Sequence, residues 1–163
     1  MIPFHSAGGK PALETLLLSY PDWLLHLALF VVRVALGLCI VTHGLGKLGF
    51  LKTNPAGVKG FATWLAALGL PYPRLNAWAA TLTEFLGGLC FTLGLGTRVV
   101  ALALTINMAV AATKGHKGGG YLILNDPPGA EYAINLAIIY GMFVLIGPGA
   151  LSLDYLLMRH LYG

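Results

Sequence analysis

One stretch of the chain, residues 23–45, constrains the fold more than any other. It is almost entirely apolar and carries a single charged side chain, Arg33, near its middle. A run of about 20 apolar residues is long enough to cross a bilayer as a helix. A charge at the centre of such a helix is costly in lipid and usually faces a partner, a water-filled cavity or a ligand. The stretch therefore predicts a membrane-spanning helix with a polar site beside it.

The composition of the whole chain supports this interpretation. Of its 163 residues, 57% are hydrophobic and 10% are charged, whereas about a quarter of a soluble domain is charged. The net charge of +4 is spread over loops and helix ends, which argues against nucleic-acid binding. The first 22 residues lack the pattern of a cleavable signal peptide. We therefore expect an integral membrane protein whose first span acts as an uncleaved insertion signal.

Further stretches have the length and apolar character of spans, and each is bounded by turn residues. These additional predicted spans are residues 75–93, 97–113 and 131–146. Together they predict an all-α, integral membrane four-helix bundle within residues 23–150. Residues 1–22 form an N-terminal leader that we place at the membrane interface, and residues 151–163 form a short amphipathic tail.

The connection between the first two spans, residues 46–74, is long for neighbouring helices of a bundle. Apolar residues recur within it at helical spacing from Val58 to Leu68, which predicts a short amphipathic interfacial helix. Its role stays open between a support on the membrane surface and a lid over a site. This connection and residues 114–130 lie on one side of the membrane and carry most of the cations. The positive-inside rule therefore places the long loops in the cytoplasm.

A second charge, Glu84, lies near the centre of the second predicted span. Because antiparallel neighbours bring their centres to a similar depth, we expect Arg33 and Glu84 to form an ion pair. Two interpretations remain open. The pair fixes only the register of two helices, or it forms the charged floor of a proton-coupled or anion-binding site. Cys39 and Cys90 are expected at different depths and therefore not bonded to each other.

Polar residues also lie at the end of the first span that faces the long connections. His43 and Lys47 are four residues apart, so one helical turn presents both on one face. Imidazole can pass protons near neutral pH, and histidine, tyrosine and asparagine can hydrogen-bond quinone carbonyls. Further candidate substrate-binding residues are Asn107, Lys114, Lys117, Asn135 and Tyr140. We predict a polar funnel that leads from a cationic mouth to the ion pair.

The sequence offers no ligand set for a metal, haem or iron–sulfur cluster, because it contains neither HxxxH nor CxxC spacing. The segments GKLGF and KGGGY lack the strand–loop–helix context of a phosphate-binding loop. We predict no metal, haem or flavin. Redox chemistry in this chain would then depend on a quinone as electron acceptor.

Short motifs follow one another along the chain in a specific order. They are Arg33-x9-His43-Gly44-x2-Lys47, Gly69-Leu70-Pro71, Glu84-x2-Gly87-Gly88, Leu93-Gly94-Leu95-x-Thr97-Arg98, and Gly147-Pro148-Gly149 followed by Leu151-Ser152-Leu153-Asp154. In this order and spacing they resemble the DoxX/DoxD family over residues 29–154. The resemblance implies a four-helix membrane protein. One branch of the family, DoxD, is the membrane subunit of a thiosulfate:quinone oxidoreductase and works with a DoxA partner.

The leading hypothesis is a quinone-linked oxidoreductase of the prokaryotic cell (inner) membrane, acting on a small anionic sulfur compound such as thiosulfate. In it Lys47, with Lys114 or Lys117, attracts the anion, and His43 shuttles protons. Arg33 and Glu84 position the quinone or the substrate. A DoxA-like or other soluble redox subunit and a second copy of the chain are further expected partners. The alternatives are a non-enzymatic scaffold for a soluble redox partner and a small-anion or proton-coupled transporter.

Overall fold

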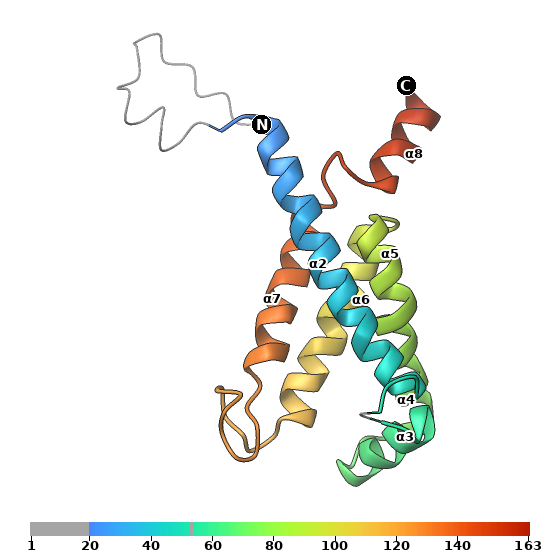
Figure 1. Cartoon of the computed structure of the whole chain (residues 1–163), viewed down its shortest axis with the longest axis vertical. Helices are drawn as coiled ribbons and strands as arrows, with labels where there is room; N and C mark the ends of the chain where they lie inside the picture. Colours follow the sequence, from blue (N-terminus) through green and yellow to red (C-terminus); the bar gives the residue numbers. More distant parts are fainter. Residues whose placement is uncertain (1–19, 53) are drawn as a thin grey trace, which may run out of the picture.

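The computed structural model describes residues 20–52 and 54–163, and within this part of the chain all regular structure is helical, with no strand (Figure 1). Most of the expected N-terminal leader, residues 1–19, lies outside the described residues. The start of the first described helix and the end of the last lie at one end of the molecule. The long connections lie at the other end.

The first predicted span lies within α2 (Asp22–Leu48), the longest helix of the described chain. Apolar side chains surround much of it, as expected of a helix with lipid on several sides. It ends at Gly49, whose φ of 92° is left-handed and is adopted by glycine without steric cost. Lys47 in the last turn is a favourable cation for the negative end of the helix dipole.

The amphipathic helix predicted between the first two spans is present as α3 (Gly57–Ala67). Its buried Ala62 and Leu65 pack with Ala77 of the following helix. In Figure 1, α3 lies across the end of the molecule beside α4. This position places its aromatic side chains next to the polar end of α2.

The second and third predicted spans each contain a π-helical turn. Along the second, α4 (Pro73–Leu82), η1 (Thr83–Gly87) and α5 (Gly88–Leu93) follow one another without a break. Along the third, α6 (Thr97–Val110) continues into η2 (Ala111–Gly115). π-Helical turns are rare and occur frequently at functional sites. The extension through η2 places Lys114 on a helix, where the sequence had predicted the start of a loop.

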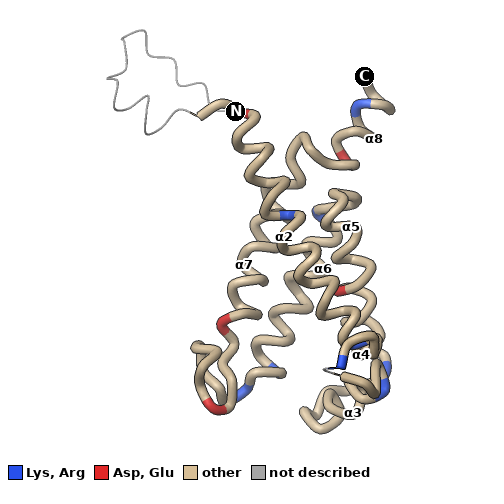
Figure 2. Tube along the Cα trace, viewed as in Figure 1, with Lys and Arg blue, Asp and Glu red and all other residues tan. Residues whose placement is uncertain are grey.

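The fourth predicted span is α7 (Glu131–Ile146), with the bounds expected from the sequence, and the tail forms α8 (Leu153–Tyr162). By length and composition, α2 and the α6–η2 helix Thr97–Gly115 can cross a membrane, and α7 is a shorter apolar helix. Figure 2 shows that charged residues are sparse along the helices and gather mainly at the end with α3 and the 116–130 loop.

Close helix contacts and aromatic rings form the interior. The ring of Phe91 on α5 meets Tyr140 and Phe143 of α7 edge-on, with centroids 5.1 and 5.0 Å apart. A Cβ on Gly88 would lie only 2.7 Å from a methyl carbon of Ile40, so glycine is required where α5 meets α2. This packed centre separates two polar clusters, one at each end.

Candidate functional site

The two buried charges of the spans belong to different clusters. Arg33 and Glu84 are 1% and 2% exposed, yet they are not partners. Arg33 donates to the carbonyl of Thr92, which follows Glu84 by about two helical turns, or roughly 12 Å. The predicted Arg33–Glu84 pair is therefore wrong. The depth count assumed coinciding helix centres, but α2 is longer than the α4–α5 stretch and extends beyond it.

The guanidinium of Arg33 is satisfied by backbone carbonyls. Its Nη1 donates to the oxygen of Pro148 at 2.7 Å, its Nη2 to that of Leu151 at 2.5 Å, and its Nε to that of Thr92 at 3.3 Å. A Cβ on Gly94, whose φ is +71°, would lie 2.8 Å from this guanidinium. Arg33 thus ties the segment after α7 to the end of α5, and we call this group the Arg33 clamp.

The carboxylate of Asp154 lies at the same end of the molecule. Asp154 accepts hydrogen bonds from the backbone N–H groups of Gly96 at 2.7 Å and Thr97 at 2.8 Å, at the start of α6. Burial raises the pKa of Asp154, but these hydrogen bonds, with the nearby charge of Arg33, outweigh it and lower the pKa below its ordinary value. The contacts at the Arg33 end therefore serve to hold chain segments together.

The Glu84 cluster lies toward the opposite end and consists of side chains. Glu84, on η1, forms an ion pair with Lys47 from the last turn of α2. Its other oxygen accepts a hydrogen bond from the Asn107 amide on α6 at 2.9 Å. The Lys47 Nζ also lies 4.9 Å from the ring centroid of Phe61 on α3. Both oxygens of a buried carboxylate are thereby paired, as a stable buried charge requires.

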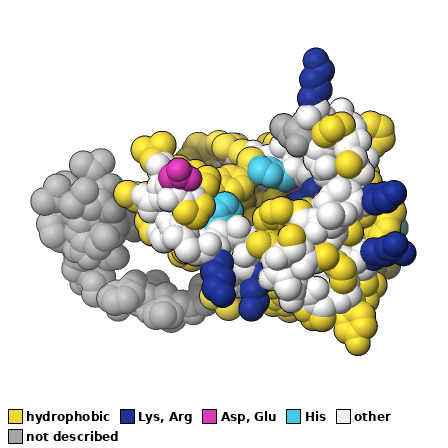
Figure 3. All heavy atoms as spheres, turned by 90° about the horizontal axis from the view of Figure 1, so that it is seen from below, with side chains coloured by type: hydrophobic (Ala, Val, Ile, Leu, Met, Phe, Trp, Pro, Cys, Tyr) yellow, Lys and Arg dark blue, Asp and Glu magenta, His cyan; other side chains and the backbone are white. Residues whose placement is uncertain are grey.

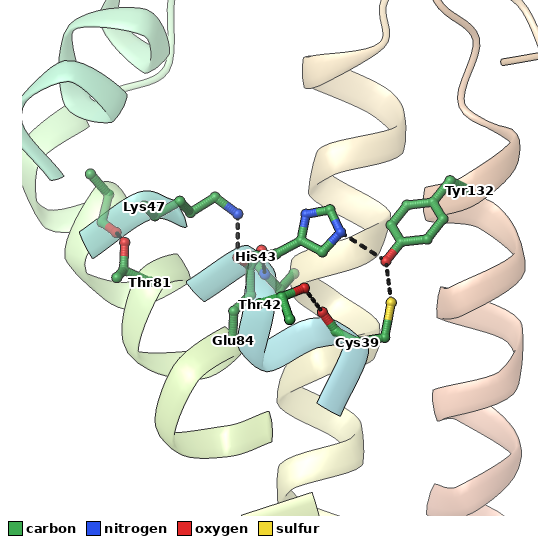
Figure 4. Close-up of polar contacts among 9 residues, drawn as sticks. Cys39, Thr42, His43, Lys47, Thr81, Glu84 and Tyr132 are labelled. Atoms are coloured by element: carbon green, nitrogen blue, oxygen red, sulfur yellow. Dashed lines mark hydrogen bonds and ion pairs between the residues drawn. The ribbon is translucent and has the colours of Figure 1, made fainter. Parts of the chain in front are cut away.

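A second row of polar groups runs beside this ion pair (Figure 4). The Tyr132 hydroxyl, from the first turn of α7, lies 3.0 Å from His43 Nε2 and 3.1 Å from Cys39 Sγ. The His43 and Tyr132 rings stack with centroids 5.3 Å apart. Cys39, His43 and Lys47 recur every four residues and so share one face of α2. Cys39 and Cys90 are both free thiols.

His43, Glu84 and Tyr132 line a cavity of about 650 Å³ between α2, α3, α4 and α6, which we call the main cavity. A volume in this range accommodates an organic ligand. Its walls are mostly apolar, with contributions from Ile40, Trp64, Leu65, Ala103 and Ile106. Its polar lining consists of His43, Lys47, Asn76, Thr83, Glu84, Asn107, Lys114, His116 and Tyr132. Glu84 is the one acidic residue in this lining and is already paired, which leaves the cavity positively charged.

The structure brings five of the predicted site residues together at this cavity. They are His43, Lys47, Glu84, Asn107 and Lys114. Two of them, Glu84 and Lys114, lie on the π-helical turns η1 and η2. Figure 3 views this end of the molecule, where lysine and arginine side chains stand at the rim and histidines lie between them.

Four other predicted site residues lie outside the cavity lining. Arg33 belongs to the clamp at the other end. Tyr140 is fully buried in the core, where its hydroxyl donates to the carbonyl of Leu36 at 3.2 Å. Asn135 accepts a hydrogen bond from Tyr121 at 3.3 Å, and Lys117 is exposed on the loop after η2.

Sequence reasoning missed several residues of the main cavity. The most informative in its lining are Tyr132, Trp64 and His116, and Cys39 lies behind Tyr132, with its Sγ 3.1 Å from the Tyr132 hydroxyl. Cys39 precedes His43 by one helical turn, so the four-residue spacing that paired His43 with Lys47 also pointed to it. Tyr132 begins the fourth span at the same end as His43, but nothing in the sequence indicates that the two rings meet. Among the described residues, no group of three or more His, Cys, Asp or Glu is arranged to hold a metal.

Comparison with known proteins places the chain in a family. The DoxX family model matches residues 28–117. Inner membrane protein YphA of Escherichia coli is 30% identical over 132 residues, which cover 77% of this chain and 87% of that protein. An uncharacterized protein of Haemophilus influenzae is 29% identical over 124 residues, covering 76% of this chain and 85% of the relative. No solved structure matches the chain.

Proposed function

Since the chain belongs to the DoxX family of membrane proteins, we propose that it is a quinone-linked membrane oxidoreductase, or the membrane subunit of one. Its substrate in this proposal is a small anionic sulfur compound such as thiosulfate. The observation that carries the proposal is the main cavity, where mostly apolar walls meet a row of hydrogen-bonded, titratable side chains. The proposed location is the inner membrane, as in the name of the Escherichia coli relative.

We propose that four helical stretches cross the bilayer, namely α2, α4–η1–α5, α6–η2 and α7. Their outward faces carry large exposed apolar side chains, for example Val31, Val99, Ile138 and Leu145, which are 55–76% exposed. Such surfaces are stable against lipid and unfavourable against water. In this arrangement the main cavity opens at the end with the long loops, which we place in the cytoplasm by their positive charge.

The donor set of the main cavity fits a quinone. The Tyr132 hydroxyl and the His43 imidazole can hydrogen-bond a carbonyl oxygen, and Trp64 offers an aromatic face near the same space. A bound quinone would supply two-electron, two-proton acceptor chemistry. The chain contributes the proton route, because His43 and Tyr132 are directly hydrogen-bonded and both reach the cavity.

The charged groups take distinct roles. Lys114 lies on η2 in the cavity lining, where its charge raises the concentration of anions near this end of the molecule. Lys47 is held in place by Glu84, and Glu84 is held in turn by Asn107. Arg33 is assigned a structural role, since its partners are carbonyls far from this cavity.

Turnover by the purified protein tests this proposal. The protein in lipid nanodiscs is mixed with decylubiquinone and thiosulfate, with and without a DoxA-like subunit, and quinone reduction is followed by absorbance. We expect reduction by the wild type and loss of the rate in His43→Ala, with unchanged helical circular dichroism. Quinone that stays oxidised under both conditions would contradict an oxidoreductase. Anion uptake into proteoliposomes without quinone would favour a transporter instead.

A further inference from the structure

A second cavity, of about 500 Å³, adjoins the main cavity, and we call it the outer cavity. It shares four lining residues with the main cavity, namely His43, Lys47, Phe61 and Trp64. Its other lining residues are Thr42, Gly46, Leu51, Asn54 and Gly60. The four shared side chains, two from α2 and two from α3, therefore form a partition between two spaces.

The two spaces differ in chemistry. Most of the additional walls of the main cavity are apolar groups of α4, α6 and η2, such as Leu68, Ala103 and Ile106. The outer cavity is smaller, and beyond the partition it adds the hydroxyl of Thr42 and the amide of Asn54. A large apolar space suits an organic ring, whereas a smaller space with a hydroxyl, an amide and a cation in its wall offers hydrogen-bond donors to a small anion.

The chain segment that lines the outer cavity contributes cations and no carboxylate, although its Lys47 is paired with Glu84 from η1. Every lining residue comes from the segment 42–64, and the sequence from 23 to 83 contains no aspartate or glutamate. Lys52 and Lys59, the neighbours of Leu51 and Gly60, are exposed there. Because no carboxylate from this segment opposes them, these lysines attract anions from solution and raise their local concentration.

Lys47 has capacity for a further ligand. Its ammonium carries three donors, and the structure gives it one carboxylate partner, Glu84. Its side chain keeps 21% exposure, whereas that of Glu84 keeps 3%. The Nε2 atom of His43 faces Tyr132, so the ring is anchored from the main-cavity side. A small anion in the outer cavity can therefore reach Lys47 without displacing Glu84 from Asn107.

From these observations we propose that the outer cavity is a separate binding site for a small divalent oxyanion of the thiosulfate class. The main cavity then holds the organic acceptor alone, and His43, Lys47, Phe61 and Trp64 separate the two ligands. This inference rests on the proposed function for the identity of the acceptor, but the anion site itself does not require turnover. The partition keeps the ligands apart while Lys47 and His43 contact both.

A matched pair of asparagines tests the separation. Asn54 lines only the outer cavity and Asn76 lines only the main cavity. Each side-chain amide donates to a nearby backbone carbonyl, Asn54 to Gly57 at 2.9 Å and Asn76 to Pro71 at 2.6 Å. Asn54→Asp and Asn76→Asp therefore remove the same kind of hydrogen bond and add the same charge, one to each space.

Anion affinity is measured by titration calorimetry with thiosulfate, and with sulfate as a redox-inactive probe, on the protein in nanodiscs without quinone. We expect Asn54→Asp to weaken binding of both anions by about tenfold or more, because it adds a negative charge beside a dianion. Asn76→Asp is expected to change anion affinity by less than about threefold. Decylubiquinone affinity is measured by tryptophan fluorescence quenching. We expect Asn76→Asp to weaken it more than Asn54→Asp does.

A second pair guards against misfolding of an Asp variant. Thr42→Phe fills the outer cavity and Ala103→Phe fills the main cavity, and both positions are exposed at the surface. Loss of anion binding in Thr42→Phe alone supports the proposal. An equal loss of anion binding in both members of a pair would mean that the two cavities form one shared site. A wild type that binds no anion would mean that there is no anion site. Either result overturns the inference.

The two proposals fail in different ways. If Asn54→Asp abolishes anion binding but no variant or wild type reduces quinone, the anion site stands and the oxidoreductase function fails. If the wild type reduces quinone with thiosulfate but Asn54→Asp binds the anion normally, the function stands and the outer cavity is not the anion site.

Discussion

The Arg33 clamp and the Glu84 cluster each bury one charge, toward opposite ends of the same helical structure, and they stabilise that charge with different kinds of partner. Arg33 is surrounded by backbone carbonyls from two chain segments. Glu84 is held by side chains from two other helices beside a cavity of about 650 Å³. Both residues are almost fully buried. Burial of a charge therefore does not by itself identify a functional site, and the kind of partner separates the two cases.

Removing the Arg33 side chain is expected to cause the largest loss of stability. Arg33→Ala leaves the carbonyls of Pro148 and Leu151 without their donor, and we expect a loss of about 3 kcal/mol in unfolding free energy. Thermal unfolding in detergent measures it. Arg33→Lys, which keeps the charge with fewer donors, is the matched control and should lose about half as much. An Arg33→Ala protein as stable as the wild type would contradict a structural role.

Glu84→Gln should lower the rate of quinone reduction more than it lowers the stability of the protein. It keeps the shape and the hydrogen bond from Asn107 but leaves Lys47 without its carboxylate. We expect quinone reduction to fall by about 100-fold, because Lys47 loses the partner that positions it, with a smaller loss of stability than in Arg33→Ala. Rate and melting temperature are measured on the same preparation. A variant that loses stability but keeps the wild-type rate would make Glu84 a second clamp.

Removing the Tyr132 hydroxyl tests whether the hydrogen-bonded side chains beside Glu84 carry protons. Tyr132→Phe deletes the hydrogen bonds to His43 and Cys39 while keeping the stacked ring. We expect about a tenfold slower quinone reduction and a stability loss of about 1 kcal/mol. Tyr140→Phe is the control, because its hydroxyl lies in the core. Equal rate losses in both variants would remove Tyr132 from the proton route.

The smallest expected effect is a pH dependence at the clamp end. The folded-state pKa of Asp154 is lowered, so its contribution is fully present above the unfolded value of about 4 and is lost as the pH falls through the folded value. We expect Asp154→Asn to be about 1 kcal/mol less stable than the wild type at pH 7, because the amide offers one acceptor oxygen where the carboxylate offers two. This difference should shrink toward zero below about pH 4. If the stability difference between Asp154→Asn and the wild type stayed constant from pH 7 to pH 3, the charge of Asp154 would not be its source.

The positions of the helices were predictable because apolar runs and turn residues determine them locally. The helix at residues 131–146 and the amphipathic α3 are the clearest cases. His43 and Lys47 were predictable for the same reason, since helical spacing places them on one face of α2.

The partners of the buried charges were not predictable in the same way. Depth counting cannot show that residues 147–152 fold back onto α5, which supplies Arg33 with carbonyls and frees Glu84 for Lys47. The meeting of Tyr132 with His43 depends equally on how α7 packs against α2. Such contacts join residues far apart in the sequence, and no local pattern encodes them.

In the proposed function the main cavity at Glu84, and not the Arg33 end, receives the quinone. Photolabelling with an azido-quinone, followed by mass spectrometry of the peptides, distinguishes these two locations. We predict labels on Trp64, Ala103 or Tyr132, which line that cavity, and their loss with excess unlabelled decylubiquinone. Competed labels confined to the segment 147–152 and to Phe30, whose ring centroid lies 5.7 Å from Arg33 Cζ, would place the quinone at the Arg33 clamp instead.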